Sequence, residues 1–237
     1  MLNTTTTPGG KSVKKIAIIG GSFNPVTNGH IKMAEAVLAS LPDLHRVWLM
    51  PAYLHPFHKH REYATERIIM LRMAETDRIR YFDYEIDHKL TGETYGTFTR
   101  LLNDPDYKHL YDFHMVIGSD CLLDFDYKWK HAERLADLVK FIVIPRQGYD
   151  IGNYDGLLSN PPHIILDTVK TPDISATRIR ERIRKNQSIQ GMVPDGAAAF
   201  IRKKNIFSSD SGYSARCVTK KPPDNAARHT AVINKLW

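Results

Sequence analysis

Only two cysteines, Cys121 and Cys217, occur in this chain of 237 residues. Two thiols cannot build a disulfide scaffold or a cysteine-rich zinc site, and such scarcity is typical of a reducing compartment. We therefore expect a cytoplasmic protein, or a nuclear one if the source is eukaryotic. No apolar run approaches the roughly 20 residues of a membrane-spanning helix. The first residues also lack the apolar stretch of a signal peptide, so no membrane association is expected.

The formal net charge of +7 is unevenly distributed. Residues 1–15 and 208–237 carry +3 each, which leaves +1 for residues 16–207. A nearly neutral centre between two basic ends is not the footprint of a nucleic-acid-binding surface, and no nucleic-acid partner is expected. The ends are rich in Thr, Ser, Gly, Pro and Lys without apolar periodicity. We expect a disordered basic tail over residues 1–15, one domain over residues 16–207 and a flexible basic tail over residues 208–237.

Nearly continuous apolar runs alternate with helical patterns along the centre of the chain. Such runs are typical of strands buried on both faces, and the order strand–helix–strand predicts right-handed crossovers between parallel strands. We therefore predict an α/β fold: a doubly wound, Rossmann-like parallel sheet with helices on both faces and a C-terminal helical part. In such sheets the ligand lies beyond the carboxyl ends of the strands. The expected strands are Lys15–Ile19, Val47–Met50, Phe113–Ile117, Phe141–Ile144 and His163–Leu166, and the first expected helices lie within residues 30–44 and 62–76.

Two common phosphate-binding signals and one metal signal fail on inspection. Gly9–Ser12 (GGKS) imitates the end of a P-loop, but it precedes the first expected strand and Thr5 stands where the loop needs glycine. No G-x-G-x-x-G follows that strand, which argues against a dinucleotide-dependent redox enzyme. His55, His58 and His60 lack evident carboxylate or thiolate partners. We interpret their segment as a phosphate-facing loop, and no metal site is predicted.

The strongest chemical signal follows the first expected strand. Residues 20–30 read GGSFNPVTNGH and lead into a helix. Paired glycines let the backbone turn sharply and approach a ligand, and Pro25 stiffens the turn. Thr27 and His30 are three positions apart, so they share one side of the first helical turn, whose free backbone N–H groups attract anions. A capped helix start would need neither the glycine pair nor the histidine, so we interpret the string as a phosphate site.

A second anion-binding pattern lies almost 150 positions later. Residues 174–180 read ISATRIR, with hydroxyl side chains at a helix start and arginines within the next turn. Alone, this pattern is equally typical of a capped surface helix. Combined with the first string it predicts two phosphate cradles on one sheet edge, and therefore a polyphosphate substrate.

Together the two strings resemble the signatures of the nicotinate/nicotinamide mononucleotide adenylyltransferase family. Further matches follow in order between about Lys15 and Phe207, and the first string is the most specific of them. They are Pro51–Lys59, Thr94–Thr97, Gly118–Asp120, Lys128–Trp129, Pro145–Tyr149 and Val193–Asp195.

The resemblance implies a role for each matched residue. His30, Thr27 and Arg180 would be catalytic, with His30 contacting the α-phosphate region of ATP. The ATP-binding residues would be Gly21, Ser22, Phe23, His30, Gly118, Asp120, Ser175, Thr177 and Arg180. The mononucleotide-binding residues would be Ser22, Asn24, Lys59, Tyr95, Thr97, Trp129 and Arg146, with Ser22 and Lys59 on the phosphate and Trp129 stacked on the pyridine ring.

The family pattern is not matched everywhere. Ala176 replaces a hydroxyl often found between the serine and the threonine, and Gly96 stands where bacterial members often carry threonine. Asn24 and Thr27 resemble eukaryotic members, whereas the region of Trp129 resembles bacterial ones. This mixture leaves the choice between nicotinate and nicotinamide substrates open. Two alternatives also remain: another nucleotidyltransferase, such as a phosphopantetheine adenylyltransferase or a cytidylyltransferase, and a non-catalytic nucleotide sensor.

The implied reaction joins ATP and the mononucleotide to give NAD, or its deamido form, and pyrophosphate. The mononucleotide phosphate is already ionised, so direct in-line attack on the α-phosphorus needs no covalent enzyme intermediate. Mg²⁺ is expected to arrive with ATP, held mostly by substrate oxygens and water. Self-association into a homo-oligomer is expected from the resemblance alone.

Overall fold

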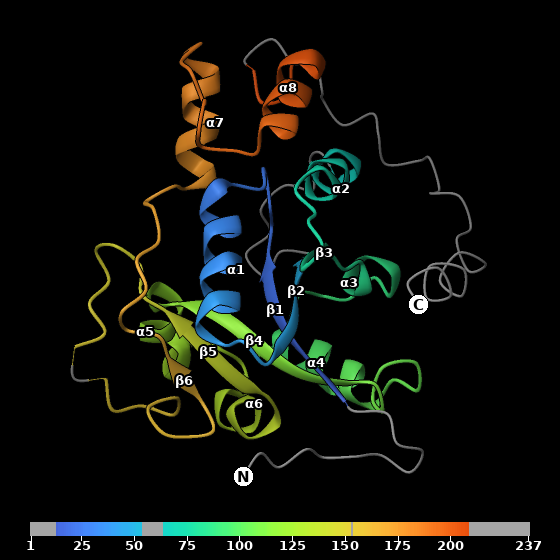
Figure 1. Ribbon diagram of the computed structural model, residues 1–237, viewed down its shortest axis with the longest axis vertical. Helices are drawn as coiled ribbons and strands as arrows, with labels where there is room; N and C mark the ends of the chain where they lie inside the picture. The colour runs from blue at the N-terminus through green and yellow to red at the C-terminus, as the bar shows by residue number, and fades with distance from the viewer. Residues whose placement is uncertain (1–12, 54–63, 153, 209–237) are drawn as a thin grey trace.

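The computed structural model of the protein describes residues 13–53, 64–152 and 154–208. Within these ranges six strands form one sheet in the order β3-β2-β1-β4-β5-β6, and every neighbouring pair is parallel (Figure 1). Strand order reverses between β1 and β4, which is where a doubly wound sheet opens a crevice for ligands. The strands are β1 (Lys14–Gly21), β2 (Leu44–Pro51), β3 (Ile79–Tyr81), β4 (Tyr111–Gly118), β5 (Lys140–Ile144) and β6 (Ile164–Ile165).

Helices cover both faces of the sheet. One face packs on α1, α2, α7 and α8, and the opposite face packs on α3 to α6. The predicted α/β fold with a C-terminal helical part is therefore confirmed. The helices are α1 (Asn28–Ser40), α2 (Ala64–Met73), α3 (Tyr84–Asp87), α4 (Thr94–Asn103), α5 (Ser119–Lys128), α6 (Ala132–Leu138), α7 (Ala176–Arg184) and α8 (Asp195–Lys204).

The central strand β1 shows why its sequence is apolar without interruption. Successive side chains of a strand point to opposite faces of the sheet. Ala17 and Ile19 accordingly belong to the core beneath α1 and α2, whereas Ile16 and Ile18 belong to the core beneath α4 and α5. All four side chains are buried because each face is covered by helices.

All five strands predicted from apolar runs are present, although the last is reduced to Ile164–Ile165. The first two predicted helices are α1 and α2. Strand β3 is not predicted, because its three residues are too short to form a recognisable run. Within the described ranges, no helix combines the length and hydropathy that crossing a bilayer requires.

Candidate active site

The turn between β1 and α1 ends in a capping arrangement that uses histidine. Thr27, at the N-cap of α1, is almost completely buried, and its hydroxyl oxygen accepts a hydrogen bond from the backbone N–H of His30 at 3.3 Å. In return, the backbone N–H of Thr27 donates to Nδ1 of His30 at 3.0 Å. Thr27 therefore fixes the imidazole in place, which supports its predicted role beside His30.

These hydrogen bonds decide which nitrogen of His30 carries the proton. A backbone N–H can only donate, so Nδ1 must offer its lone pair, and the hydroxyl of Thr27, 2.9 Å away, donates to the same atom. Burial, assisted by the positive charge of Arg146, lowers the pKa of His30 from 6.5 to about 4. The ring is therefore neutral at pH 7, with its proton on Nε2, where it can donate to an anionic oxygen.

The second predicted cradle lies against this turn. Figure 1 shows α7 at the end of the molecule where α1 begins. Arg180 of α7 donates through Nη1 to the carbonyl oxygen of Asn24 at 2.7 Å, although 156 positions separate the two residues. A Cβ atom added to Gly29 would stand 3.3 Å from the carbonyl oxygen of Ile174, which is tighter than ordinary van der Waals contact. The two motifs thus share one side of the sheet edge.

The start of α7 presents donors and hydroxyls as its sequence predicts. Ser175 caps the helix by accepting from the backbone N–H of Arg178 at 3.2 Å. Thr177 accepts from Nη2 of Arg180 at 3.1 Å, which orients the guanidinium through both of its terminal nitrogens. Partial burial lowers the pKa of Arg180 from its usual value, yet arginine remains charged in proteins. This helix start can therefore receive a polyphosphate.

The carboxyl end of β4 forms a neighbouring part of the site. A Cβ added to Gly118 would clash with the carboxylate of Asp120, so that side chain would have to shift. Asp120 forms an ion pair with Arg146 at 2.5 Å. Ser119, fully buried, accepts from the backbone N–H of Arg146 at 2.9 Å and donates to the carbonyl oxygen of Tyr149 at 2.9 Å. The positive charge of Arg146 also contributes to the lowered pKa of His30, so this group lies near the phosphate motifs.

Aromatic side chains stand at the first turn of α4 and at the end of α5. The ring of Tyr95 lies 5.0 Å from that of His131, the residue before α6. Trp129, at the end of α5, is partly buried and packs on Phe125 with ring centroids 5.2 Å apart. Thr97 is buried, and its hydroxyl donates to Glu85 at 3.0 Å, so this hydroxyl is already occupied within the protein.

Two groups of predicted site residues, one around His30 and Arg180 and one around Asp120 and Arg146, therefore lie at the carboxyl edge of the sheet. The third group lies on α4 and at the end of α5. Lys59 lies outside the described residues. Sequence reasoning missed Arg67, whose guanidinium donates to carbonyl oxygens of Ser22 and Ala52. A signal for it exists, because Arg67 stands at helical spacing with apolar Met70, Leu71 and Ala74 and so belongs to the buried stripe of α2. Glu85 and His131 were also missed, and no separate role was predicted for Ser119 or for Asn28, which bonds to Gly191 and Met192.

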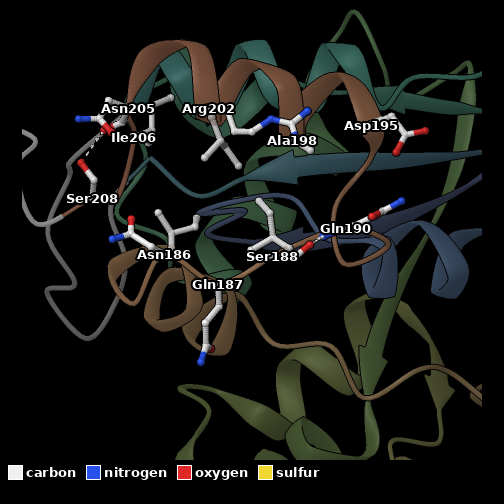
Figure 2. Close-up of a pocket in the computed structure, with 13 residues that line it drawn as sticks. Asn186, Gln187, Ser188, Gln190, Asp195, Ala198, Arg202, Asn205, Ile206 and Ser208 are labelled. Carbon is white, nitrogen blue, oxygen red and sulfur yellow. Dashed lines mark hydrogen bonds between the residues drawn. The ribbon is translucent and has the colours of Figure 1, made fainter.

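A cavity of about 770 Å³ lies away from these groups, between α7 and α8 (Figure 2). Its described lining combines amides of Asn186 and Asn205 with apolar Ile183 and Ile201, and none of the predicted site residues belongs to it. Among the described residues, no cluster of three or more His, Cys, Asp or Glu side chains is suited to holding a metal ion.

Comparison with known proteins identifies the family to which this chain belongs. Residues 18–182 match the cytidylyltransferase-like family model. A Clostridium tetani protein named "Probable nicotinate-nucleotide adenylyltransferase" is 30% identical over 208 residues, covering 82% of this chain and 100% of the relative. A Hydrogenobaculum protein of the same name is 35% identical over 195 residues, covering 81% of this chain and 98% of the relative.

Solved structures agree on the fold. The Plasmodium falciparum nicotinic acid mononucleotide adenylyltransferase, complexed with NaAD, superposes with a TM-score of 0.66 at 22% identity, covering 82% of this chain and 97% of that chain. The same enzyme complexed with APC superposes with a TM-score of 0.64. The sequence matches and this shared fold agree with the motifs at the carboxyl edge of the sheet. The chain therefore belongs to the cytidylyltransferase-like family and, within it, to the nicotinate-nucleotide adenylyltransferases.

Proposed function

We propose that the protein joins ATP to nicotinate mononucleotide or nicotinamide mononucleotide, releasing pyrophosphate. The observation that carries this proposal is the convergence of the two phosphate motifs, seen in the 2.7 Å hydrogen bond from Arg180 to the carbonyl oxygen of Asn24. One triphosphate can then be held by both motifs at once. The names of the sequence relatives favour nicotinate mononucleotide as the better substrate.

The chemistry is an in-line displacement at the α-phosphorus of ATP. An oxygen of the mononucleotide phosphate forms the new bond, the bond from the α-phosphorus to the bridging oxygen breaks, and pyrophosphate leaves with that electron pair. No protein nucleophile takes part, because the attacking phosphate is already ionised. The protein contributes orientation, which can lower a barrier by about 7–11 kcal/mol, and preorganised donors that stabilise developing charge.

His30 is assigned to the α-phosphate. Its neutral ring carries a proton on Nε2 because Nδ1 accepts from Thr27. An N–H donor that is already oriented gains strength as negative charge grows on the α-phosphate oxygens, so it stabilises the transition state more than the ground state. Thr27 acts by holding the ring, and therefore supports the reaction without contacting the reacting atoms.

The remaining phosphates and the adenosine are assigned to flanking elements. Ser175, Thr177 and Arg180 would bind the β- and γ-phosphates, where the charged guanidinium also stabilises the departing pyrophosphate. Gly118 and Asp120, beside Arg146, would hold the adenosine. Gly21, Ser22 and Phe23 would line the path where the two nucleotides meet.

The mononucleotide is assigned to the region between the first phosphate motif and α4. Ser22 and Lys59 would bind its phosphate, and Asn24 and Arg146 are assigned to the same substrate. Tyr95 and Trp129 would pack on the pyridine ring, and Thr97 would support that end through its bond to Glu85. His131 joins this group because its ring lies beside that of Tyr95.

Mg²⁺ is proposed to enter as part of the ATP complex. The guanidinium of Arg180, held beside the hydroxyl of Thr177 at the start of α7, suits phosphate oxygens and repels a cation. The ion would therefore be held by the triphosphate and water, where it neutralises part of the phosphate charge. We further propose a cytoplasmic location and a homo-oligomer, the latter testable by size-exclusion chromatography with light scattering.

Pyrophosphate release tests the proposal directly. The full chain is incubated with ATP, Mg²⁺ and one of three acceptors: nicotinate mononucleotide, nicotinamide mononucleotide or phosphopantetheine. We expect release with a pyridine mononucleotide, fastest with the nicotinate form, and formation of the matching dinucleotide. Release only with phosphopantetheine would assign the chain to another transferase reaction. ATP binding without release with any acceptor would indicate a nucleotide sensor.

A further inference from the structure

Arg67 is a charged side chain on the buried face of α2. Only 7% of the surface of Arg67 is exposed, and the other buried positions of its helical stripe are apolar. A charged residue is therefore unexpected there. Burial lowers the pKa of Arg67 from its usual value, but a guanidinium does not lose its proton in proteins. A buried charge is tolerated only when its donors are satisfied, so its partners carry information about its role.

Both partners of Arg67 are backbone carbonyl groups at the carboxyl edge of the sheet. Nη1 donates to the oxygen of Ser22 at 2.6 Å, within the phosphate-binding turn. Nη1 and Nη2 both lie 3.2 Å from the oxygen of Ala52, in the segment after β2. The backbone N–H of Ala52 also donates to the oxygen of Gly21 at 2.9 Å. One guanidinium thus joins the two loops that are assigned to the nucleotide phosphates.

A buried carboxylate acts on the other side of the same peptide group. Glu85 is 6% exposed, and its Oε2 accepts from the backbone N–H of Tyr53 at 3.4 Å. In a trans peptide the C=O and the following N–H point in opposite directions. The peptide between Ala52 and Tyr53 therefore lies with its oxygen toward Arg67 and its N–H toward Glu85. Each end of its dipole meets the charge that stabilises it.

The arrangement continues toward the end assigned to the pyridine ring. Oε1 of Glu85 accepts from the hydroxyl of Thr97 at 3.0 Å, one helical turn from the start of α4. Tyr95 belongs to that same turn. Hydrogen bonds therefore run from Ser22 through Arg67, the clamped peptide and Glu85 to α4. This path spans both ends of the proposed mononucleotide site.

We propose that Arg67 and Glu85 are positioning residues that clamp the Ala52–Tyr53 peptide and so set the distance between the mononucleotide phosphate and the reacting α-phosphorus. The inference rests on the proposed function. Because the carbonyl of Ser22 faces Arg67, the N–H of Phe23 points away from α2, where it can serve a ligand. Phe23 holds φ at 47°, in the left-handed region, so the orientation of this turn depends on external support.

Replacing Arg67 with methionine tests the clamp, and Arg72→Met is the matched control. Arg72 lies on the same helix but is exposed, with its guanidinium 5.2 Å from the ring centre of Tyr81. At a temperature well below unfolding, we expect Arg67→Met to lower kcat by about ten- to a hundredfold, the effect of misplacing reacting groups by roughly an ångström. The KM for the mononucleotide should rise several-fold and the KM for ATP should change little. Arg72→Met should leave all three parameters near wild type.

The Arg67→Lys variant distinguishes a positioning role of Arg67 from a purely stabilising one. Arg67→Lys keeps the buried charge but offers a compact ammonium group in place of the planar fork that contacts two carbonyls. We expect it to unfold at a higher temperature than Arg67→Met while kcat stays low. Recovery of both stability and kcat in Arg67→Lys would overturn the positioning role. Wild-type kinetics in folded Arg67→Met would overturn it as well.

Glu85→Gln provides a second route if Arg67→Met does not fold. Glutamine keeps the shape and one acceptor oxygen but removes the charge, so the same split between the two KM values is expected in weaker form. Unchanged kinetics in Glu85→Gln would contradict the clamp. A wild-type chain that releases no pyrophosphate would instead refute the proposed function, so the two failures are distinguishable.

Discussion

The proposed phosphate end and the proposed ring end of the site are built differently. At the phosphate end, Thr27, His30 and Arg180 are oriented by hydrogen bonds to the protein itself. At the ring end, Tyr95 and Trp129 are placed by packing against neighbouring aromatic rings. Hydrogen bonds fix donors in direction, as transition-state stabilisation requires, whereas packed rings offer area and shape. If the proposed roles are right, the chemistry should be sensitive to changes at one end, and substrate choice to changes at the other.

The largest effect is expected at His30. His30→Ala removes the oriented Nε2 donor, so kcat should fall by roughly a hundred- to a thousandfold while mononucleotide affinity changes little. Steady-state kinetics with both substrates, together with equilibrium binding of the mononucleotide, measure the two quantities. A variant that keeps most of its turnover would remove His30 from its assigned role.

Arg180→Ala should act mainly on ATP. Loss of charge-assisted hydrogen bonds corresponds to about 1.5–3 kcal/mol, or roughly a ten- to hundredfold rise in the KM for ATP. Arg178→Ala on the same helix is the control. The side chain of Arg178 is exposed, and its ion pair with Asp173 is long, at 3.9 Å. Equal weakening of both substrates by Arg180→Ala would contradict its placement on the β- and γ-phosphates.

A smaller and more selective effect is expected at Trp129. If its ring stacks on the pyridine, Trp129→Ala should raise the KM for the mononucleotide about tenfold, consistent with roughly 1–3 kcal/mol per stacked base. Trp48, buried among aromatic residues of the core, is the contrasting position. Trp48→Ala should lower the unfolding temperature strongly and leave the KM of the folded fraction unchanged. If Trp129→Ala behaves like Trp48→Ala, then Trp129 is a core residue and not a ligand of the ring.

The last prediction concerns stability and its dependence on pH. Because the pKa of His30 is lowered to about 4, the unfolded chain binds a proton there between about pH 6.5 and 4 while the native state does not. The contribution of His30 to the free energy of unfolding is therefore complete above pH 6.5 and declines as the pH falls. His30→Gln should flatten this decline in denaturant titrations at pH 4 to 7, whereas replacing the exposed His109 should not. An unchanged slope in His30→Gln would show that the imidazole is not held in its neutral form.

The fold was largely predictable, because apolar runs such as Phe141–Ile144 are typical of strands that are buried on both faces of a parallel sheet. Strand β3 escaped prediction, since its three residues depend on pairing with β2 and not on a pattern of their own. The helix starts at Thr27 and Ser175 were predictable, because a helix cap is a local interaction. The clamp was not predicted, because Arg67 and Glu85 meet one peptide from two separate helices.

The sequence alone determined which residue types stand at each strand end and helix start, and hence the class of ligand. Backbone turns and helix caps depend on neighbours within about one helical turn, so local sequence is sufficient to specify them. Only the tertiary structure decided that Arg180 reaches Asn24, that burial lowers the pKa of His30, and that Arg67 and Glu85 share one peptide. Those outcomes depend on burial and on contacts between distant segments, which exist only once the sheet has brought the segments together.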